Sequence, residues 1–259
     1  MNEANAVRTA SQDGVLWITV DRPRVHNALD SAAHHALHAA FDRFAGDDAL
    51  RCAILTASGS ATFCAGSDLK ERAAASRDAH PSSGFGGLTR RFDLNKPVIA
   101  AVNGAAIGGG FELVLACDLA VAAAHATFSL PEPRVGLTAT GGGGLQRLAR
   151  DLPWKLAADI ALAGRELTAD EALACGVINA VVPQEELLAT AAEYAHRIMR
   201  GAPLAVEASK AVMQRALSEV DLRTAITRGY PEVDRLLDSE QAREGMRAFL
   251  EKRPPDWQR

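Results

Sequence analysis

Residues 96–123 read KPVIAAVNGAAIGGGFELVLACDLAVAA, and this stretch carries the strongest information about the fold. It opens with an apolar, β-branched run from Pro97 to Val102, which is typical of a strand buried on both faces. Three consecutive glycines, 108–110, then precede an apolar segment with a single carboxylate, Glu112. This pattern predicts a helix inside the protein that is entered through a glycine turn.

The glycine turn and its carboxylate allow two interpretations. Glycine lets a ligand approach the backbone closely, and the first N–H groups of a helix, which lack intrahelical partners, can stabilise developing negative charge. Glu112 must be paired, protonated or placed in a polar pocket. The segment alone therefore fits a catalytic carboxylate or a packed helix with a salt-bridged glutamate. A dinucleotide site is disfavoured because the glycines read G-x-x-x-G-G-G and not G-x-G-x-x-G.

The composition is that of a globular protein. With 259 residues, 48% of them apolar, the chain can form one large domain or a domain with a smaller appendage. A net charge of −4 without a long basic block argues against non-specific nucleic-acid binding. The four cysteines are widely separated in apolar runs, which indicates reduced, buried thiols. Neither a targeting signal nor a membrane-spanning run is evident, so we expect a cytoplasmic protein with no membrane partner.

Strands and helices are expected to alternate on both sides of residues 96–123. Expected strands are Val15–Val20, Cys52–Thr56, Thr127–Ser129 and Val177–Val182, and expected helices are Asp30 or Ser31 to about Ala45, Pro153–Ala163 and Ala169–Cys175. Thr168 and Glu171 form a T-x-x-E capping box. From residue 185 the pattern is helical alone, which divides the chain into residues 1–184 and an appendage, 185–259. Apolar stripes on the appendage favour oligomerisation.

Two further segments are candidates for chemistry. Residues 63–71, FCAGSDLKE, again lead from a glycine turn into a helix and predict free N–H groups at Ser67 and Asp68. Glu132 lies between two prolines, and this stiff backbone suits a positioned catalytic group. A surface glutamate in a rigid turn fits Glu132 equally well.

A histidine pair and a segment of small residues give weaker signals. His34 and His38 fall one turn apart on a helix, but no third ligand is evident, so a solvated face is expected in place of a metal site. Residues 73–87 are rich in Ala, Ser and Gly without an apolar period. They predict a mobile segment over a surface or cleft that helps to decide what enters.

Taken in order and spacing, these segments resemble the enoyl-CoA hydratase/isomerase (crotonase) family over nearly the whole chain. The matching segments are Asp21-Arg22-Pro23 with Asn27-Ala28-Leu29, residues 63–71, residues 96–104, residues 108–113, Pro131-Glu132, Gln146-Arg147-Leu148, Glu244-Gly245-Met246 and residues 249–253. The resemblance implies an α/β fold, a crotonase-like spiral of ββα units with a helical C-terminal region. It also implies a homotrimer or a dimer of trimers.

The resemblance further implies a reaction. Backbone N–H groups of Ser67 and Gly109 would bind the oxygen of an acyl-CoA thioester, because preformed donors stabilise the enolate that forms on attack at the β-carbon. Glu112 and Glu132 would hold a water between them, with Glu132 favoured as the proton donor. Relatives that only shift a double bond commonly lack the match to Glu112, so hydration of a trans-2-enoyl-CoA is favoured. Neither a metal nor a cofactor is implied, since coenzyme A is part of the substrate.

Positions for the substrate follow from the same resemblance. They are Arg24, His26, Ala65, Gly66, Asp68, Leu69, Gly108, Pro131, Thr140, Phe249 and Lys252. For Arg24 and His26 a solvated turn is equally compatible. Relatives usually carry Ala where this chain has Ser67, which leaves the backbone donor intact. They usually carry a Pro-Gly or Pro-Asp pair where residues 137–144 read LTATGGGG, which leaves the acyl group and the reaction open.

Other functions remain as alternatives. Within the family these are an enoyl-CoA isomerase, or a hydratase of a specialised acyl group such as a carnitinyl or an aromatic one. Some relatives bind RNA through a lysine-rich helix, but the corresponding residues 31–45 carry one arginine and several histidines. A non-catalytic CoA-ester scaffold is the third alternative, and tight binding without turnover would identify it.

Overall fold

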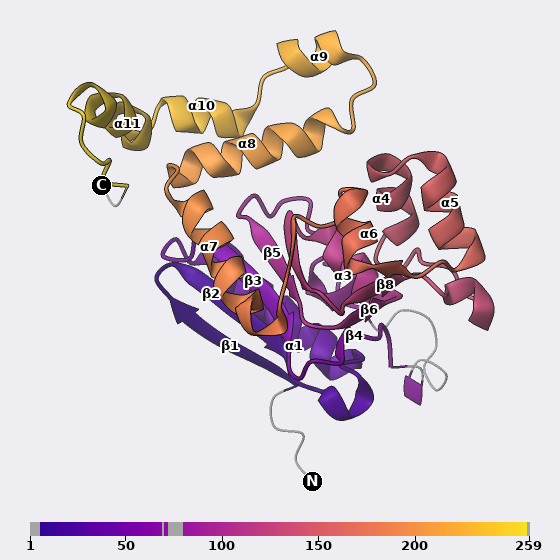
Figure 1. Cartoon of the computed structure of the whole chain (residues 1–259). Helices are drawn as coiled ribbons and strands as arrows, with labels where there is room; N and C mark the ends of the chain where they lie inside the picture. The colour runs from indigo at the N-terminus through magenta and orange to yellow at the C-terminus, as the bar shows by residue number, and fades with distance from the viewer. Residues whose placement is uncertain (1–5, 69, 72–79, 258–259) are drawn as a thin grey trace.

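Two sheets form the body of the protein, whose computed structural model describes residues 6–68, 70–71 and 80–257 (Figure 1). The larger sheet has the order β1-β2-β3-β5-β7-β10 and the smaller one β4-β6-β8-β9. The strands are β1 (Val7–Gln12), β2 (Val15–Val20), β3 (Cys52–Ala57), β4 (Thr62–Cys64), β5 (Val98–Val102), β6 (Ala105–Ile107), β7 (Leu119–Ala123), β8 (Thr127–Ser129), β9 (Leu167–Thr168) and β10 (Ala180–Val182).

Successive strand pairs contribute one strand to each sheet. The first members, β3, β5 and β7, lie parallel in the larger sheet, and the second members, β4, β6 and β8, lie parallel in the smaller one. Antiparallel pairing is confined to β1 with β2 and β8 with β9 among the described strand pairs. This arrangement is the predicted spiral of ββα units.

Helices cover both faces of the larger sheet. The α-helices of the described residues are α1 (Ser31–Gly46), α3 (Gly109–Ala116), α4 (Gly144–Asp151), α5 (Trp154–Ala163), α6 (Ala169–Ala174), α7 (Leu187–Met199), α8 (Pro203–Ala216), α9 (Leu222–Thr227), α10 (Pro231–Leu237) and α11 (Glu240–Leu250). In β5, Val98, Ala100 and Val102 join the core that contains α1 and α3, whereas Ile99 and Ala101 pack with α7. This strand is therefore buried on both faces, as its continuous apolar run predicts.

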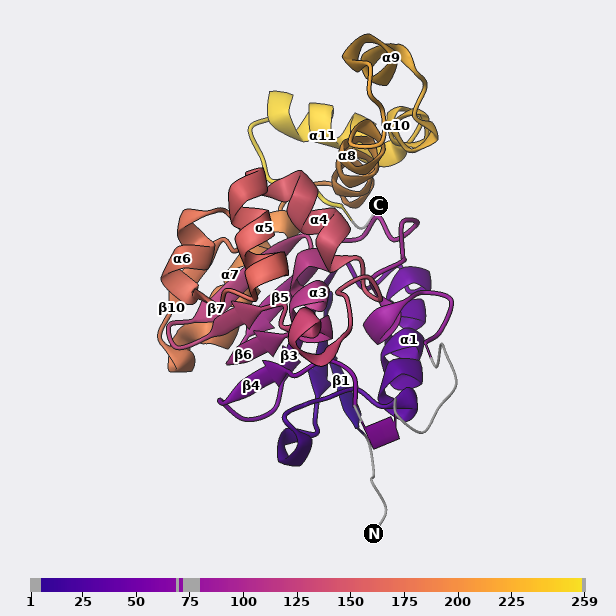
Figure 2. The same ribbon diagram turned by 90° about the vertical axis from the view of Figure 1, so that its right-hand side faces the viewer.

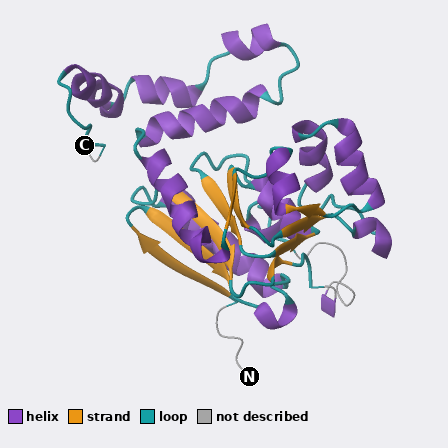
Figure 3. Cartoon of the chain, viewed as in Figure 1, coloured by secondary structure: helices purple, strands orange, loops and turns teal. Residues whose placement is uncertain are grey.

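Helices α8 to α11 form an arm at one end of the body (Figures 1 and 2), and Figure 3 shows that this arm contains helices and loops alone. The preceding helix, α7, packs on the sheet through Leu187, Ala191 and Ala195. The projecting arm therefore begins at α8, although the purely helical pattern begins near residue 185. No helix in the described part of the chain has the length and apolar character needed to cross a membrane.

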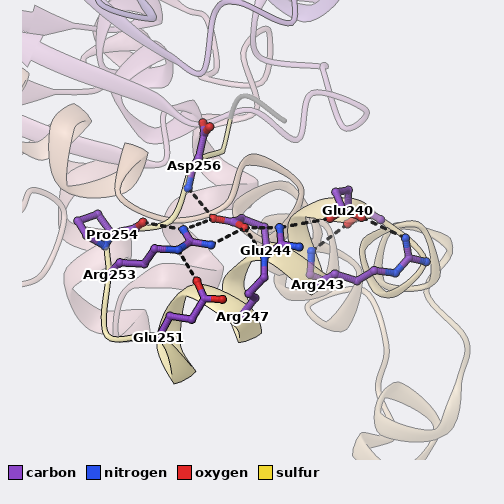
Figure 4. Close-up of polar contacts among 10 residues, drawn as sticks. Glu240, Arg243, Glu244, Arg247, Glu251, Arg253, Pro254 and Asp256 are labelled. Atoms are coloured by element: carbon purple, nitrogen blue, oxygen red, sulfur yellow. Dashed lines mark hydrogen bonds and ion pairs between the residues drawn. The ribbon is translucent and has the colours of Figure 1, made fainter.

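Residues 253–257 are held against the arm, and the main contact is with a buried carboxylate (Figure 4). Glu244 on α11 accepts hydrogen bonds from Arg253 at 2.6 Å, from the Asp256 N–H at 3.0 Å and from Arg247 at 2.5 Å. These donors hold the pKa of Glu244 well below its usual range, and the hydrogen bond from Arg253 has the largest effect. Trp257 Nε1 then donates to Arg200 O at 2.9 Å, which fastens the end of the described chain beside the start of the arm.

The predicted helix boundaries are largely confirmed because local caps set them. Asp30 caps α1 by accepting from Ala33 N at 2.8 Å, and both hydrogen bonds of the Thr168–Glu171 capping box are present. The predicted strand Val177–Val182 is shorter, because the N–H groups of Val177 and Ile178 bond to Ala172 O at the end of α6. Strands β1, β4, β6, β7 and β9 were not predicted: β1 is a polar, largely exposed edge, β4, β6 and β9 have two or three residues, and β7 directly follows the buried helix α3.

The solvated face predicted for His34 and His38 is wrong. His34 is buried, its Nδ1 accepts from Gly86 N at 2.9 Å, and burial lowers its pKa to about 3, so the ring is neutral. His38 Nδ1 lies 2.8 Å from Ser83 Oγ. Residues 73–79 of the predicted mobile segment lie outside the described residues, but its end, the turn η2 (Phe85–Gly87), is buried.

The arm is joined to the sheet by an ion pair that can be tested. Lys210 Nζ on α8 lies 2.7 Å from Asp118 Oδ2, which also accepts from Val98 N at 2.8 Å. Lys210→Met leaves the partly exposed Asp118 carboxylate without its cation and should lower the free energy of unfolding by about 1.5 kcal/mol. The exposed Lys155→Met should change it by less than about 0.5 kcal/mol. Equal effects of the two changes in denaturant titrations would contradict this role of Lys210.

Candidate active site

Two glycine turns meet at the start of α3. A Cβ placed on Gly66, whose φ is +90°, would lie 3.1 Å from Gly109 N, and one on Gly110 would lie 1.9 Å from Cys64 O. The turn after β4 therefore packs directly on the backbone at the N-terminus of α3. Only residues without a side chain permit this approach.

Each turn contributes an N–H group to the contact region. Ser67 forms a parallel bridge with Leu29, in which Leu29 N donates to Gly66 O at 2.8 Å and Asp68 N donates to Leu29 O at 2.9 Å. The Ser67 N–H takes no part in this bridge, whereas the Asp68 N–H, predicted to be free, is already bonded. Gly109 is the first residue of α3, and its N–H precedes the first intrahelical bond. Two N–H groups from touching turns can together stabilise an oxyanion.

Glu112 is buried in α3, and two glycines of the run 141–144, Gly142 and Gly144, lie against its side chain. Glu112 is 3% exposed, and its Oε1 accepts from Gly144 N, at the start of α4, at 2.8 Å. A Cβ on Gly142 would lie 2.7 Å from the Glu112 Cβ, and one on Gly144 would lie 2.9 Å from its Cγ. The segment 137–144, which is expected from the sequence to differ from that of relatives, thus contacts this carboxylate through its glycines. The N-terminal end of α4 stabilises negative charge there.

Glu132 begins the turn η3 (Glu132–Val135) after Pro131. A Cβ on Gly108 would lie 2.8 Å from Glu132 Oε1, and the Gly108 N–H is bonded to Ser129 O at 2.8 Å. Gly108 caps α3, and Glu112 N donates back to its carbonyl at 3.0 Å. Both glutamates therefore belong to the surroundings of the α3 N-terminus.

The substrate positions expected near the first glycine turn differ in their exposure to solvent. Ala65 N donates to His26 O at 3.1 Å, so these two residues are neighbours, and Arg24 and His26 are exposed on η1 (Pro23–Val25) and just after it. Asp68 is half-buried, with Oδ2 3.7 Å from Arg22. Leu69 lies outside the described residues.

The remaining expected positions fall in two places. Thr140 is exposed in the loop before the glycine run, with its Oγ1 3.0 Å from Thr138 Oγ1. Phe249 lies on α11 and Lys252 just after it, in the arm, so the single chain does not bring them to the α3 N-terminus (Figure 1).

Two residues at the site had no assigned role in the sequence interpretation. The Phe85 ring lies against Gly109, since a Cβ there would be 2.4 Å from Phe85 Cζ. Arg147 bonds to the glycine run through Gly142 O at 2.7 Å. The sequence signals Arg147 only through the matching segment 146–148 and gives no signal for Phe85. Within the described residues no group of three or more His, Cys, Asp or Glu is arranged to hold a metal.

Known proteins are similar to this chain in both fold and sequence. The sequence profile of the enoyl-CoA hydratase/isomerase family matches residues 10–259. Carnitinyl-CoA dehydratases from Salmonella arizonae and Proteus mirabilis are 46% and 43% identical, each over 98% of both chains. The crystal structure of an enoyl-CoA hydratase from Mycobacterium tuberculosis H37Rv has a TM-score of 0.92 at 37% identity, covering 98% of this chain and 99% of that one. That of carnitinyl-CoA hydratase from Mycobacterium avium has a TM-score of 0.79 at 40% identity, covering 98% of each.

The chain therefore belongs to the enoyl-CoA hydratase/isomerase family. It is an enzyme of the crotonase superfamily, with the α/β spiral and helical C-terminal region expected from the sequence.

Adjacent glycines in the run 141–144 provide a matched test of its packing. Gly142→Ala places a methyl group against Glu112 and should lower the thermal unfolding midpoint by several degrees, since overpacking costs about 1–3 kcal/mol. Gly141 is exposed with open space around its Cα, so Gly141→Ala should leave the midpoint unchanged or raise it slightly. Equal midpoints for the two variants would show that the run does not pack on Glu112 as described.

Proposed function

We propose that the protein catalyses the reversible addition of water to the double bond of a trans-2-enoyl-CoA thioester. The contact between the two glycine turns supports this proposal, because it gathers two backbone donors and two glutamates around the start of α3. Double-bond isomerisation requires no added water, so the presence of Glu112 beside Glu132 favours hydration. Product analysis after incubation with a 3-enoyl-CoA would separate the two reactions.

In the proposed reaction the thioester oxygen accepts hydrogen bonds from Ser67 N and Gly109 N. A water held between the carboxylates attacks the β-carbon, and Glu112 takes the proton that this water loses. The electrons of the double bond move to the thioester oxygen as an enolate. Each backbone donor stabilises that charge by about 3 kcal/mol relative to its absence.

Glu132, in its acid form, then delivers a proton to the α-carbon, and the enolate collapses to the 3-hydroxyacyl-CoA. Addition is syn, since both glutamates act from the same side of the bound chain. Two carboxylates that share a pocket titrate as a coupled pair, which allows one to act as base while the other acts as acid. The proton gained by Glu112 balances the one given by Glu132, and exchange with solvent restores the starting state.

Self-association is part of this proposal. The arm exposes large apolar side chains that a single chain leaves uncovered; they include Met213, Leu217, Leu222, Ile226, Met246, Phe249 and Leu250. Exposed apolar surface of this kind favours contact between copies. We propose a homotrimer or a dimer of trimers, in which Phe249 and Lys252 reach a bound acyl-CoA.

A carnitinyl group is the second candidate for the acyl part of the substrate. Relatives that are 43–46% identical over 94–98% of this chain carry the name carnitinyl-CoA dehydratase. For this chain, the corresponding reaction would remove water from a 3-hydroxy-4-trimethylammonio acyl thioester. It uses the same glutamates in the reverse direction.

Replacing either glutamate tests the acid–base assignment. Glu112→Gln and Glu132→Gln should each lower kcat for hydration about 1,000-fold, because an amide neither accepts nor delivers the proton. The loss of ultraviolet absorbance of the conjugated thioester measures the rate. Glu193→Gln, an exposed change on α7, serves as the control and should leave kcat unchanged. Full activity of Glu132→Gln would reject the mechanism.

Paired substrates test the acyl group. If the carnitinyl assignment is right, kcat/KM for dehydration of carnitinyl-CoA should exceed that for 3-hydroxybutyryl-CoA by at least about tenfold, since the two thioesters differ only in the trimethylammonium group. A preference for 3-hydroxybutyryl-CoA would reject the carnitinyl assignment while retaining hydration.

A further inference from the structure

Arg147 on α4 joins two segments that are far apart in the sequence. Its Nη1 donates to Gly142 O at 2.7 Å and its Nη2 donates to Thr89 O at 2.8 Å. The side chain is half-buried, and the proposed reaction assigns it no step. One guanidinium therefore ties the glycine run to the segment that follows η2.

Each of the tied segments touches a different part of the site. The glycine run packs on Glu112 and supplies the Gly144 N–H that binds its Oε1. The other segment carries Phe85, whose ring lies against Gly109 and whose carbonyl accepts from Thr89 N at 3.3 Å. Arg147 thus connects the surroundings of the proposed base with those of one oxyanion donor.

Electrostatic interactions also link Arg147 to Glu112. Burial lowers the pKa of Arg147, and Glu112, Asp151 and Cys117 oppose that shift. The interaction is mutual, so the guanidinium also stabilises the ionised carboxylate of Glu112.

Other titratable groups face this pair from neighbouring elements. Burial raises the pKa of Asp151, whose charge Arg147 and Arg150 stabilise. Burial also raises the pKa of the Cys117 thiol at the end of α3, which stays neutral. Glu132 approaches from η3 beside Gly108 and adds negative charge to the site when it is ionised. Among these groups, Arg147 supplies the positive charge that acts on Glu112.

We propose that Arg147 is a positioning residue for hydration: it holds the glycine run so that the Gly144 N–H stays on Glu112, and it keeps Glu112 ionised to accept the proton of water. This inference rests on the proposed function. The first role needs a guanidinium, because the compact ammonium of a lysine does not reproduce a fork that reaches two separate carbonyls, whereas a lysine retains the positive charge that the second role needs.

Kinetics of Arg147→Gln and Arg147→Lys distinguish positioning from general support of the fold. Arg147→Gln should lower kcat for enoyl-CoA hydration about 100-fold with a smaller change in KM, because a small displacement of the base has an effect of that size. Its acid limb in the pH profile of kcat/KM should move to higher pH, since loss of the cation raises the pKa of Glu112. Arg147→Lys should keep the acid limb near that of the unaltered enzyme and recover part of kcat.

Arg51→Gln provides the matched control. Arg51 is also half-buried, burial lowers its pKa, and it donates to a backbone carbonyl, Gly201 O, at 2.6 Å beside the arm. This change should leave kcat and the acid limb unchanged.

An unchanged kcat and acid limb in Arg147→Gln would overturn the inference, as would the same loss in Arg51→Gln. If Arg147→Gln does not fold, Arg147→Lys decides: a lower kcat with an unmoved acid limb supports the inference, and an unaltered kcat overturns it. An unaltered enzyme without hydratase activity would instead overturn the proposed function, and this inference with it.

Discussion

The close contact between the turn after β4 and the first residues of α3 is the constraint on which the site depends. A methyl group on Gly110 would overlap Cys64 O, and one on Gly66 would crowd Gly109 N. Glycine at these positions brings two turns from successive ββα units together, each with a backbone N–H. The spiral supplies that proximity, because β4 and β6 are parallel neighbours in the smaller sheet and end at the same edge.

The buried carboxylate of Glu112 beside this contact requires compensation, since an isolated ionised group in apolar surroundings is costly. Glu112 receives a hydrogen bond from the N-terminus of α4, and the glycines around it leave no room for another side chain. Arg147 supports the same loop from outside. A site built in this way combines a charged base with a rigid backbone, as acid–base chemistry on a thioester requires.

Local patterns predicted the parts of the fold that local physics determines. The apolar run before Asn103, the cap at Asp30 and the Thr168–Glu171 box each depend on neighbouring residues, and each is present. Contacts between distant segments were not predictable. The Asp68 N–H donates to Leu29 O, and Arg147 donates to Thr89 O, which is 58 residues away in the sequence. The glycine run was identified as a departure from the family, but its packing on Glu112 needed the folded chain.

The most direct measurement is a crystal structure of the protein with a saturated acyl-CoA, which has no double bond to hydrate. The account predicts a thioester oxygen about 3 Å from both Ser67 N and Gly109 N, with the carboxylates of Glu112 and Glu132 beside the α- and β-carbons. A thioester oxygen bonded to neither backbone nitrogen, or an acyl chain bound away from the start of α3, would contradict it.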